Sequence, residues 1–510
     1  MGLETLAIFA SAALSQAGAA TFVANAAFFA ISNVGTVAIT LGSAAFQIQQ
    51  QQAMQRALAA NNQDAGFQQA IKQAIPRQRL LIGETTTAGA TFFAKSDPPY
   101  TWYGYAFAGH KVDGLQSLII NNNLVFLDED GFATSTPFRD GSNWYIKASF
   151  RNGDIDQAID PIIAADFPDM PSTFRQRGHA TLVIKRYHGY GADINAKNED
   201  HTRVFGDGGQ FNPLARIRGA LCYDPRQTGH VLSDSSTHEF SRNAFITMAR
   251  AMTHKWPDMQ YFDQDRLDWD KIAEGADICD KWEFDRNGIP FRRYTADGVI
   301  QSGDDPAAFL EEFRKCFDGN YNLERGKIYA TAGDARLPQA TFHINMMTGG
   351  FEYQPERSSA TLVNTVKPQF ISLDRNYQTV KGPVLKRTDL ITLDNQPLEQ
   401  TINLAFVEGD PRAQRHAHYT LARGRAGRSL SVGATMEARD WKVGLPYRVD
   451  LPEPFNRVNG IYELKGKTWN ANMRGYQLVF IQDTSERFAD APNYEQEFEL
   501  DDDTLSAEAA

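Results

Sequence analysis

A phosphate-binding loop is suggested by residues 460–468, which end in Gly466-Lys467-Thr468. Such a loop needs four residues between its two glycines, because the backbone amides must curl around the β-phosphate. Here five residues separate Gly460 from Gly466, and they alternate as the residues of a strand do. The spacing therefore predicts a hairpin edge and not a nucleotide site.

Two other stretches have a loose likeness to ligand-binding loops. Residues 206–209 read Gly-Asp-Gly-Gly, but Pro213 and a strand follow them where a phosphate loop has a helix. Four aspartates are spaced loosely like calcium ligands: Asp263, Asp265, Asp268 and Asp270. They lack the central glycine and the terminal glutamate of an EF-hand loop. We interpret the first stretch as a glycine turn and the second as a solvated acidic turn.

Metal and thiol chemistry have equally weak candidates. His416 and His418 lie two residues apart near the start of a helix, and such pairs from several subunits meeting on an axis could hold a metal. A single pair is more often structural or exposed. The three cysteines, Cys222, Cys279 and Cys316, are far apart and form no CxxC pair, so we expect buried, reduced thiols.

Familiar catalytic motifs are missing from the sequence. It contains no GxSxG elbow, no HExxH helix and no pair of carboxylates in a pattern typical of glycoside hydrolysis. We therefore predict no catalytic residue, no cofactor-binding residue and no metal-binding residue. The chain is interpreted as a structural part and not as an enzyme.

The composition is that of an ordered globular protein with several domains. The 510 residues are 42% hydrophobic, 11% aromatic and 22% charged, and a chain of this length is expected to hold three or four domains. The net charge of −11 argues against a nucleic-acid-binding surface, because phosphate contacts need clustered lysine and arginine. An acidic wall could still line a channel through which DNA passes.

The N-terminal segment, residues 1–58, has no charged residue between Glu4 and Arg56 and is rich in Ala, Gly and Phe. A helix that spans a bilayer needs about 20 apolar residues, so two short spans or one hairpin would fit. The density of small residues suits close helix packing, in a membrane or along a symmetry axis. We favour a buried helical bundle that joins subunits, with membrane insertion as the alternative.

The next two regions are predicted from apolar periodicity and turn residues. Residues 59–200 predict a β-rich domain with a hairpin turn at 121–123, a short helix within 161–171, a strand at 181–187 and polar turns at 189–198. Residues 201–345 predict a mixed α+β domain. Its expected elements are a helix over 241–255 with Ser241 as N-cap, a strand over 292–301, a helix that starts at Asp305-Pro306 and stops at Gly319, and a hairpin over 323–330.

The remaining sequence predicts a second β-rich domain and a tail. The domain covers residues 346–490 and is broken by one helix at 411–424. Its expected strands include 446–449, 461–464 and 476–482. The acidic tail, residues 491–510, is expected to be disordered.

Short motifs occur along the chain in the order found in one protein family. They are Pro76-Arg-Gln-Arg79 with Gly83, Phe107-Ala-Gly-His110, Val112-Asp-Gly114, Arg216-Ile-Arg-Gly219, Tyr223-Asp-Pro-Arg226, Asn243-Ala244, Ala276-Asp-Ile-Cys-Asp280, Arg293-Tyr294, a hairpin at Gly326 that ends at Gly333, Asn364-Thr-Val366 and a helix near Arg415. Each motif is weak alone, and their order carries the likeness. The chain resembles the tail-tip attachment, or host-specificity, proteins of long-tailed phages and the matching hub proteins of gene transfer agents.

The resemblance implies an α+β, predominantly β fold. It implies a multidomain tail hub with tube-type β domains, a small barrel-like domain and the apolar helical N-terminus. In this family two tube-type domains per chain give a homotrimer quasi-sixfold symmetry, which matches a hexameric tube ring. The expected function is a structural virion protein, the central hub of the tail tip or baseplate, which closes the tail tube and opens for DNA ejection.

The resemblance also implies partners and a location. The partners are the distal tail or tail-tube ring protein, the tape-measure protein at the N-terminal helices, other tip or fibre proteins, and the host membrane during ejection. The genome passes through the lumen without specific binding. The location is the tail tip of a virion assembled in the bacterial cytoplasm. Family members often continue into fibronectin-like domains and a receptor-binding fibre. This chain stops soon after Arg487, so we expect another protein to recognise the host.

Two further hypotheses differ from the structural hub. The first is a pore-forming protein that inserts its N-terminal helices into a membrane, and leakage from liposomes would support it. The second is a tail-associated cell-wall hydrolase, which the missing motifs disfavour and which turnover of peptidoglycan would support.

Overall fold

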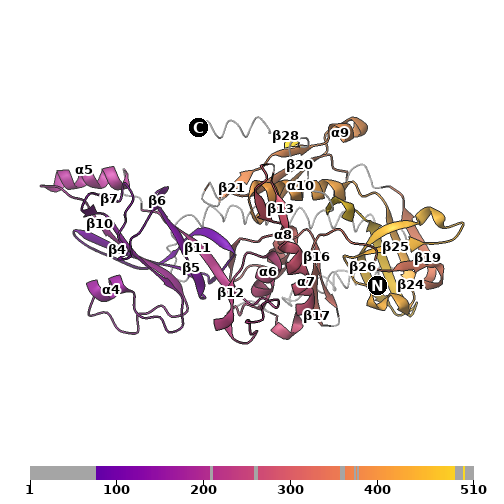
Figure 1. The fold of residues 1–510 in the computed structure, drawn as a ribbon, viewed down its shortest axis with the longest axis horizontal. Coiled ribbons are helices and arrows are strands. Elements are labelled where there is room, and N and C mark those ends of the chain that lie inside the picture. The colour runs from indigo at the N-terminus through magenta and orange to yellow at the C-terminus, as the bar shows by residue number, and fades with distance from the viewer. Residues whose placement is uncertain are drawn as a thin grey trace, which may run out of the picture.

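The computed structural model describes residues 76–206, 211–257, 262–285, 287–324, 326–356, 362–372, 375, 378–488 and 498–499. The predictions for the apolar segment 1–58 lie outside these residues, as does the predicted disorder of residues 491–497 and 500–510. A β region that begins the described chain lies at one end of the long axis, and a six-stranded sheet lies at the other (Figure 1). Helices α6, α7 and α8 lie between them.

Two antiparallel sheets form the first β region. One has the strand order β3-β4-β10-β9, and the other has the order β12-β11-β5-β6 with β2 also paired to β11. The strands are β2 Glu84–Ala88, β3 Ala90–Asp97, β4 Tyr100–Ala108, β5 Val112–Ile120, β6 Asn123–Val125, β7 Arg139–Asp140, β8 Asn143–Trp144, β9 Ile146–Asn152, β10 Ala180–Tyr187, β11 Pro213–Cys222 and β12 Glu239–Phe240. Side chains of both sheets, such as Leu182 and Ile217, share one apolar core. The alternation of each strand thus buries one face of each sheet.

Two local predictions in this region are confirmed. Asn121 and Asn122 have φ values of 49° and 64°, a left-handed conformation that asparagine tolerates, and β5 pairs with β6 across them. The short helix predicted within 161–171 is α4, Pro161–Asp166, capped by the side chain of Asp160.

The polar turns predicted at 189–198 are wrong beyond residue 193, where helix α5, Ile194–Phe205, begins. Asp193 caps the helix, because its Oδ1 accepts a hydrogen bond from the amide of Ala196 at 2.9 Å. Val204 and Phe205 are buried in the core of the two sheets and hold the last turn of the helix there. Because only the last two residues of this polar helix are buried, the sequence shows no apolar periodicity that would predict a helix.

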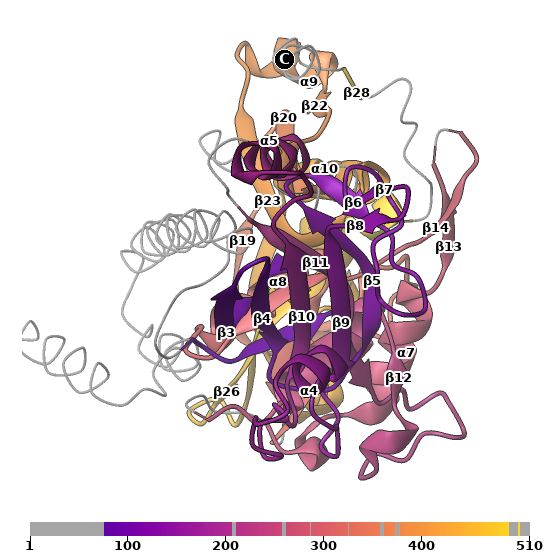
Figure 2. The same cartoon turned by 90° about the vertical axis from the view of Figure 1, so that its left-hand side faces the viewer.

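The central region packs three helices against short strands. The elements are β1 Arg79–Ile82, which pairs with β15 Gly298–Gln301; helices α6 Ala244–Thr253, α7 Trp269–Cys279 and α8 Pro306–Cys316; and the hairpins β13 Trp282–Phe284 with β14 Pro290–Arg292 and β16 Asn320–Glu324 with β17 Lys327–Thr331. Their apolar side chains form the largest core of the described chain. Figure 2 shows the hairpin of β13 and β14 standing clear of the body.

Helix α8 agrees with the prediction in most details. Asp305 accepts a hydrogen bond from the amide of Ala307, and Pro306 occupies the first turn. The apolar side chains of one face are buried: Phe309, Leu310, Phe313, Cys316 and Phe317. The end of the helix differs from the prediction, because the residue that adopts a positive φ is Asp318, at 43°, and not Gly319. Glycine is needed at 319 for another reason: a Cβ there would lie 1.7 Å from the carbonyl oxygen of Thr331.

Three other predictions for the central region are tested. The hairpin at 323–330 is confirmed by β16 and β17. The helix predicted over 241–255 is shorter, and its N-cap is Asn243 instead of Ser241. The single strand predicted over 292–301 is wrong, since the chain leaves β14 after Arg292 and begins β15 only at Gly298.

The C-terminal region contains a six-stranded sheet with the order β18-β25-β26-β27-β24-β19. The strands are β18 Thr341–His343, β19 Met347–Gln354, β24 Ser429–Ala434, β25 Pro446–Asp450, β26 Gly460–Asn470 and β27 Gly475–Gln482. Because β18 and β19 follow one another in the chain but lie at opposite ends of the order, the sheet curls around its own apolar core. The strands predicted at 446–449, 461–464 and 476–482 are confirmed. Residues 460–468 lie in β26, which pairs with both β25 and β27 and is therefore not an edge.

Apart from its last strand, a smaller sheet lies between β19 and β24 of the six-stranded sheet in the sequence. Strand β20 pairs with β21, β22 and β23, and β28 pairs with β22. The bounds are β20 Thr365–Ser372, β21 Gln378–Lys381, β22 Val384–Lys386, β23 Glu399–Glu408 and β28 Phe498–Glu499. The predicted helix at 411–424 is confirmed as α10, Asp410–Gly424. The prediction of a single helix in residues 346–490 is wrong, because the structure contains a second helix, α9 Thr388–Asp394.

Candidate functional site

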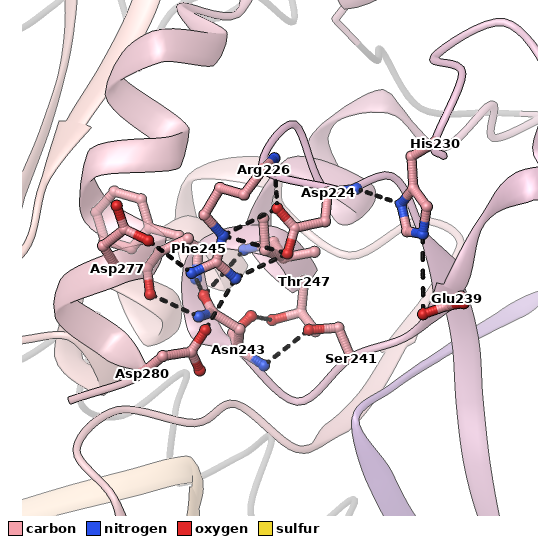
Figure 3. A network of polar contacts seen from close by, with 12 residues as sticks. Asp224, Arg226, His230, Glu239, Ser241, Asn243, Phe245, Thr247, Asp277 and Asp280 are labelled. Carbon is pink, nitrogen blue, oxygen red and sulfur yellow. Dashed lines mark hydrogen bonds and ion pairs between the residues drawn. The ribbon is translucent and has the colours of Figure 1, made fainter. Parts of the chain in front are cut away.

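The motif after β11 forms the centre of a polar network that joins a turn to the end of α7 (Figure 3). Arg226 binds Asp224 with two nitrogens, Nε to Oδ1 at 3.0 Å and Nη2 to Oδ2 at 2.7 Å. The same guanidinium reaches the end of α7, where it contacts Asp277 at 3.0 Å and Asp280 at 2.8 Å. All three nitrogens of the guanidinium therefore bind carboxylates, and the group acts as a cross-link between the turn and the helix.

The pKa values of this network favour its charged form. Burial alone would raise the pKa of Asp224, but the hydrogen bonds from Arg226 lower it overall. Burial alone would lower the pKa of Arg226, and the bonds to Asp224, Asp280 and Asp277 raise it overall. A carboxylate held ionised by a bidentate arginine is poorly suited to give or take a proton. This chemistry fits structural support.

Asn243 fixes the start of α6 against α7 beside this network (Figure 3). Its Oδ1 accepts a hydrogen bond from the amide of Phe245 at 3.1 Å, and its Nδ2 donates to the carbonyl of Ala276 at 2.9 Å. The two helices approach closely because position 275 is glycine: a Cβ there would lie 2.1 Å from the Phe245 ring. Phe245, which follows the motif Asn243-Ala244, thus packs against a glycine of α7.

A second network lies under the β13–β14 hairpin. Glu283 accepts from Arg293 at 2.6 Å and from Arg415 of α10 at 3.1 Å. Arg293 also binds Asp334 at 2.8 Å, which follows the hairpin of β16 and β17. Arg415 is 2% exposed and additionally contacts Tyr419. The network joins the base of the projecting hairpin to α10 and to the segment that leads into the six-stranded sheet.

A third network surrounds Asp297, whose side chain is fully buried. Arg242 binds it through Nε at 2.8 Å and Nη2 at 2.7 Å, and the amide of Glu84 donates to it at 2.8 Å. Arg242 also contacts Glu408 of β23 at 3.2 Å. Gly83 has a φ of 56° and passes so close to Asp297 that a Cβ would lie 2.3 Å from the carboxylate. The first β region, the central helices and the smaller sheet meet at this carboxylate.

The sequence candidates for metal chemistry do not come together. His416 is buried near Tyr294, and burial lowers its pKa to about 4, while His418 is half-buried and its ring lies beside Tyr419. Asp263, Asp265 and Asp270 are exposed, as a solvated turn predicts. Asp268 instead caps α7 by accepting from the Lys271 amide at 3.2 Å. In the ranges that the structure describes, no group of three or more His, Cys, Asp or Glu is placed to hold a metal ion.

The other sequence candidates are located as follows. The three cysteines are buried and free, as predicted. Gly206 follows α5, residues 207–210 lie outside the described chain, and strand β11 comes next. Within the described residues, no helix is long and apolar enough to cross a membrane.

Sequence reasoning identified the motifs but missed most of the carboxylates that bind them. Asp297, Glu283 and Asp334 were not singled out, although each pairs with an arginine of a motif or of its flanking residues. The available signal was weak: Asp297 stands between Ala296 and Gly298 in a run of small and apolar residues. A charged residue inside such a run is a candidate for a buried ion pair.

No model of a known protein family matches the chain, and no curated protein matches it. The fold is similar to that of a chain in the virion of a native gene transfer agent particle. That alignment covers 84% of this chain and 89% of the other, with a TM-score of 0.54 and 13% identity. At this identity the similarity shows a shared fold alone.

Two further matches are tail proteins, both with lower TM-scores. One is the tail protein from Neisseria meningitidis MC58, with a TM-score of 0.30, 12% identity and coverage of 80% of this chain and 97% of that one. The other is the 43 kDa tail protein of prophage MuSo2 from Shewanella oneidensis, with a TM-score of 0.27, 10% identity and coverage of 82% and 96%. Scores this low carry no argument of their own.

The similarity to the gene transfer agent virion chain confirms the predicted resemblance at the level of the fold. The predominantly β fold with several sheets is confirmed as well.

Proposed function

We propose that the chain is the hub subunit of a phage-type tail tip or baseplate, where three copies close the tail tube and open it for DNA ejection. The observation that carries the proposal is the fold shared with the gene transfer agent virion chain over most of both chains. The collinear motifs support it, and two of their arginines, Arg226 and Arg293, bind carboxylates inside the central region. In this proposal the protein is structural and catalyses no reaction.

Exposed sheet edges support assembly into a closed ring. Within the described chain, β3, β19 and β21 each stand at the end of a sheet order and have one strand neighbour. Unpaired edges invite pairing with another chain, and a closed ring of subunits covers them. We propose that such edges meet between the three copies and against the tail-tube ring protein.

The remaining parts of the proposal concern the lumen and the partners. The net charge of −11 would repel DNA from the channel wall and let the genome pass without specific binding. The apolar segment 1–58 would lie on or near the axis, against the tape-measure protein and then the host membrane. Other tip or fibre proteins would attach outside and recognise the host. The assembled protein would be located at the tail tip of the virion.

The mass of the protein in solution tests the trimer. Light scattering after size exclusion should give the mass of three chains for the full-length protein. A variant that lacks residues 1–56 shows whether the apolar segment is the sole source of assembly: if it stays trimeric, the β regions themselves hold the ring together. A full-length protein that stays monomeric at every concentration would contradict the proposal.

A further inference from the structure

Arg186 is a buried cation on β10 that no carboxylate neutralises within the described residues. The residue is 9% exposed, and it lies on the core side of the sheet beneath α5. Its Nε and Nη1 are buried and make no hydrogen bond. By contrast, Arg226, Arg242, Arg293 and Arg415 each bind at least one carboxylate.

Three aromatic rings surround the guanidinium of Arg186. Its central carbon lies 5.5 Å from the ring centre of Tyr103, 5.3 Å from that of Phe205 and 5.2 Å from that of Phe211. Aromatic faces stabilise a positive charge, but they do not accept the in-plane hydrogen bonds of a guanidinium. Donors buried without an acceptor are costly. The cage therefore keeps the charge in place and leaves its donors without acceptors.

Two histidines lie beside the cage, and their surroundings keep them neutral. The rings of His188 and His201 lie 6.5 Å apart. Burial, followed by the charge of Arg186, lowers the pKa of each histidine. The carboxylate beside His201 belongs to Asp200, and it is already bound by Arg203 at 2.7 Å and by the amide of Tyr190 at 2.7 Å. It is therefore not available to Arg186.

We propose that Arg186, with His188 and His201 beside it, is a binding site for one small oxyanion, a phosphate or a carboxylate. Nη2 is the nitrogen of the guanidinium that is not closed off by the cage, so the anion binds at that end. The small exposed fraction restricts the ligand to a free ion or to the end of a slender side chain. Inorganic phosphate is one source. A carboxylate from a second copy of this acidic chain is the other, and that source rests on the proposed assembly.

The first arm of the test measures thermal unfolding in inorganic phosphate against sodium chloride of equal ionic strength. Arg186→Met removes the charge and fits the aromatic cage. Arg203→Met is the matched control, because Arg203 also lies over an aromatic ring but has Asp200 as its partner. Phosphate should raise the Tm of the wild type and of Arg203→Met by about 2 °C and leave that of Arg186→Met unchanged. Without phosphate, Arg186→Met should unfold no earlier than the wild type, since it removes an uncompensated buried charge.

The second arm compares the masses of the three proteins in phosphate-free buffer. If Arg186→Met dissociates and Arg203→Met does not, the ligand is a carboxylate of a second copy. The proposal is overturned if phosphate stabilises all three proteins equally. It is also overturned if phosphate has no specific effect and Arg186→Met assembles like the wild type. A monomeric wild type contradicts the proposed trimer, and the phosphate arm then decides the anion site alone.

Discussion

The central region and the six-stranded C-terminal sheet are stabilised by different interactions. In the central region, buried arginines bind carboxylates that come from distant segments, as Arg415 binds Glu283 across 132 residues. In the C-terminal sheet, the interior is aromatic and aliphatic, with Trp441 and Tyr447 stacked at 4.3 Å and Phe480 fully buried. Buried ion pairs stabilise the central region, whereas the packing of apolar side chains stabilises the C-terminal sheet.

The difference explains where the recognisable motifs lie. Apolar cores tolerate exchange among residues of similar volume, so they leave little trace in a sequence. A buried ion pair tolerates no loss of one partner, because the other charge would stay buried and unpaired. The motif residues Arg226 and Arg293 are of this second kind, and the motif residue Asn243 makes a buried hydrogen bond to the carbonyl of Ala276.

The largest expected effect is that of Glu283→Ala in the central region. The change leaves Arg293 and Arg415 without their shared carboxylate, and the expected loss in the free energy of unfolding is about 4 kcal/mol. Hydrogen exchange of peptides from the β13–β14 hairpin and α10 measures it. The matched control is Asp389→Ala, which removes an exposed pair with Arg387 and should cost far less. Equal losses in the two variants would contradict the contrast between the regions.

Phe480→Ala tests the C-terminal sheet in the same way. Removing a fully buried ring should leave a cavity and destabilise this sheet by about 3 kcal/mol. Faster hydrogen exchange should be confined to peptides of β24 to β27, while α6 and α8 keep their protection. Phe455→Ala is the control, because this ring is 38% exposed. If exchange rises equally in the central helices, the two regions are not separate in stability.

Acid should weaken the link between the first β region and the central region. His110 accepts a hydrogen bond from the amide of Leu81 through Nε2, and its Nδ1 contacts the carbonyl of Lys111, so the ring must be neutral. Burial lowers the pKa of His110 to about 3. The unfolded chain takes up a proton below about pH 6.5 and the folded chain does not, so stability is present above that pH and falls below it.

For His110 this linkage amounts to about 2 kcal/mol between pH 7 and pH 5. Urea unfolding at the two pH values measures it. His110→Gln keeps an acceptor for the Leu81 amide but cannot titrate, so its stability should fall less over the same interval. A variant with the same pH dependence as the wild type would exclude His110 as the cause.

The smallest expected effect is that of Asp277→Ala, at the exposed end of the Arg226 network. The side chain of Asp277 is 71% exposed, and Arg226 keeps Asp224 and Asp280, so the expected loss is about 0.5 kcal/mol. Chemical denaturation compares it with Asp224→Ala, which removes the buried bidentate partner and should cost several times more. A loss as large as that of Asp224→Ala would show that the three carboxylates act as one unit.

Much of the secondary structure could be predicted because its signals are local. Asp305 and Pro306 start α8, and the asparagines at 121 and 122 make the turn of a hairpin. The strand predicted over 292–301 fails for a tertiary reason. The amide of Ala296 binds the carbonyl of Arg242, and that of Asp297 binds the carbonyl of Phe406, so these residues bridge other segments instead of extending a ladder.

The candidate networks could be predicted only in part. The sequence marks Arg226 and Arg293 as motif residues, but their partners depend on how distant segments fold together. Glu283 lies 132 residues from Arg415, and nothing local to either residue indicates the pairing. The site at Arg186 is equally hidden, since its cage is assembled from β4, the end of α5 and Phe211.

The central claim is that this chain closes a tail tube as a threefold hub. Electron cryomicroscopy of the intact particle, with the chain fused to a small globular marker at its C-terminus, tests it most directly. The account predicts three markers around a closed object at the tip of the tail. Markers along the tube, at the head, or in a number that does not fit threefold symmetry would contradict it.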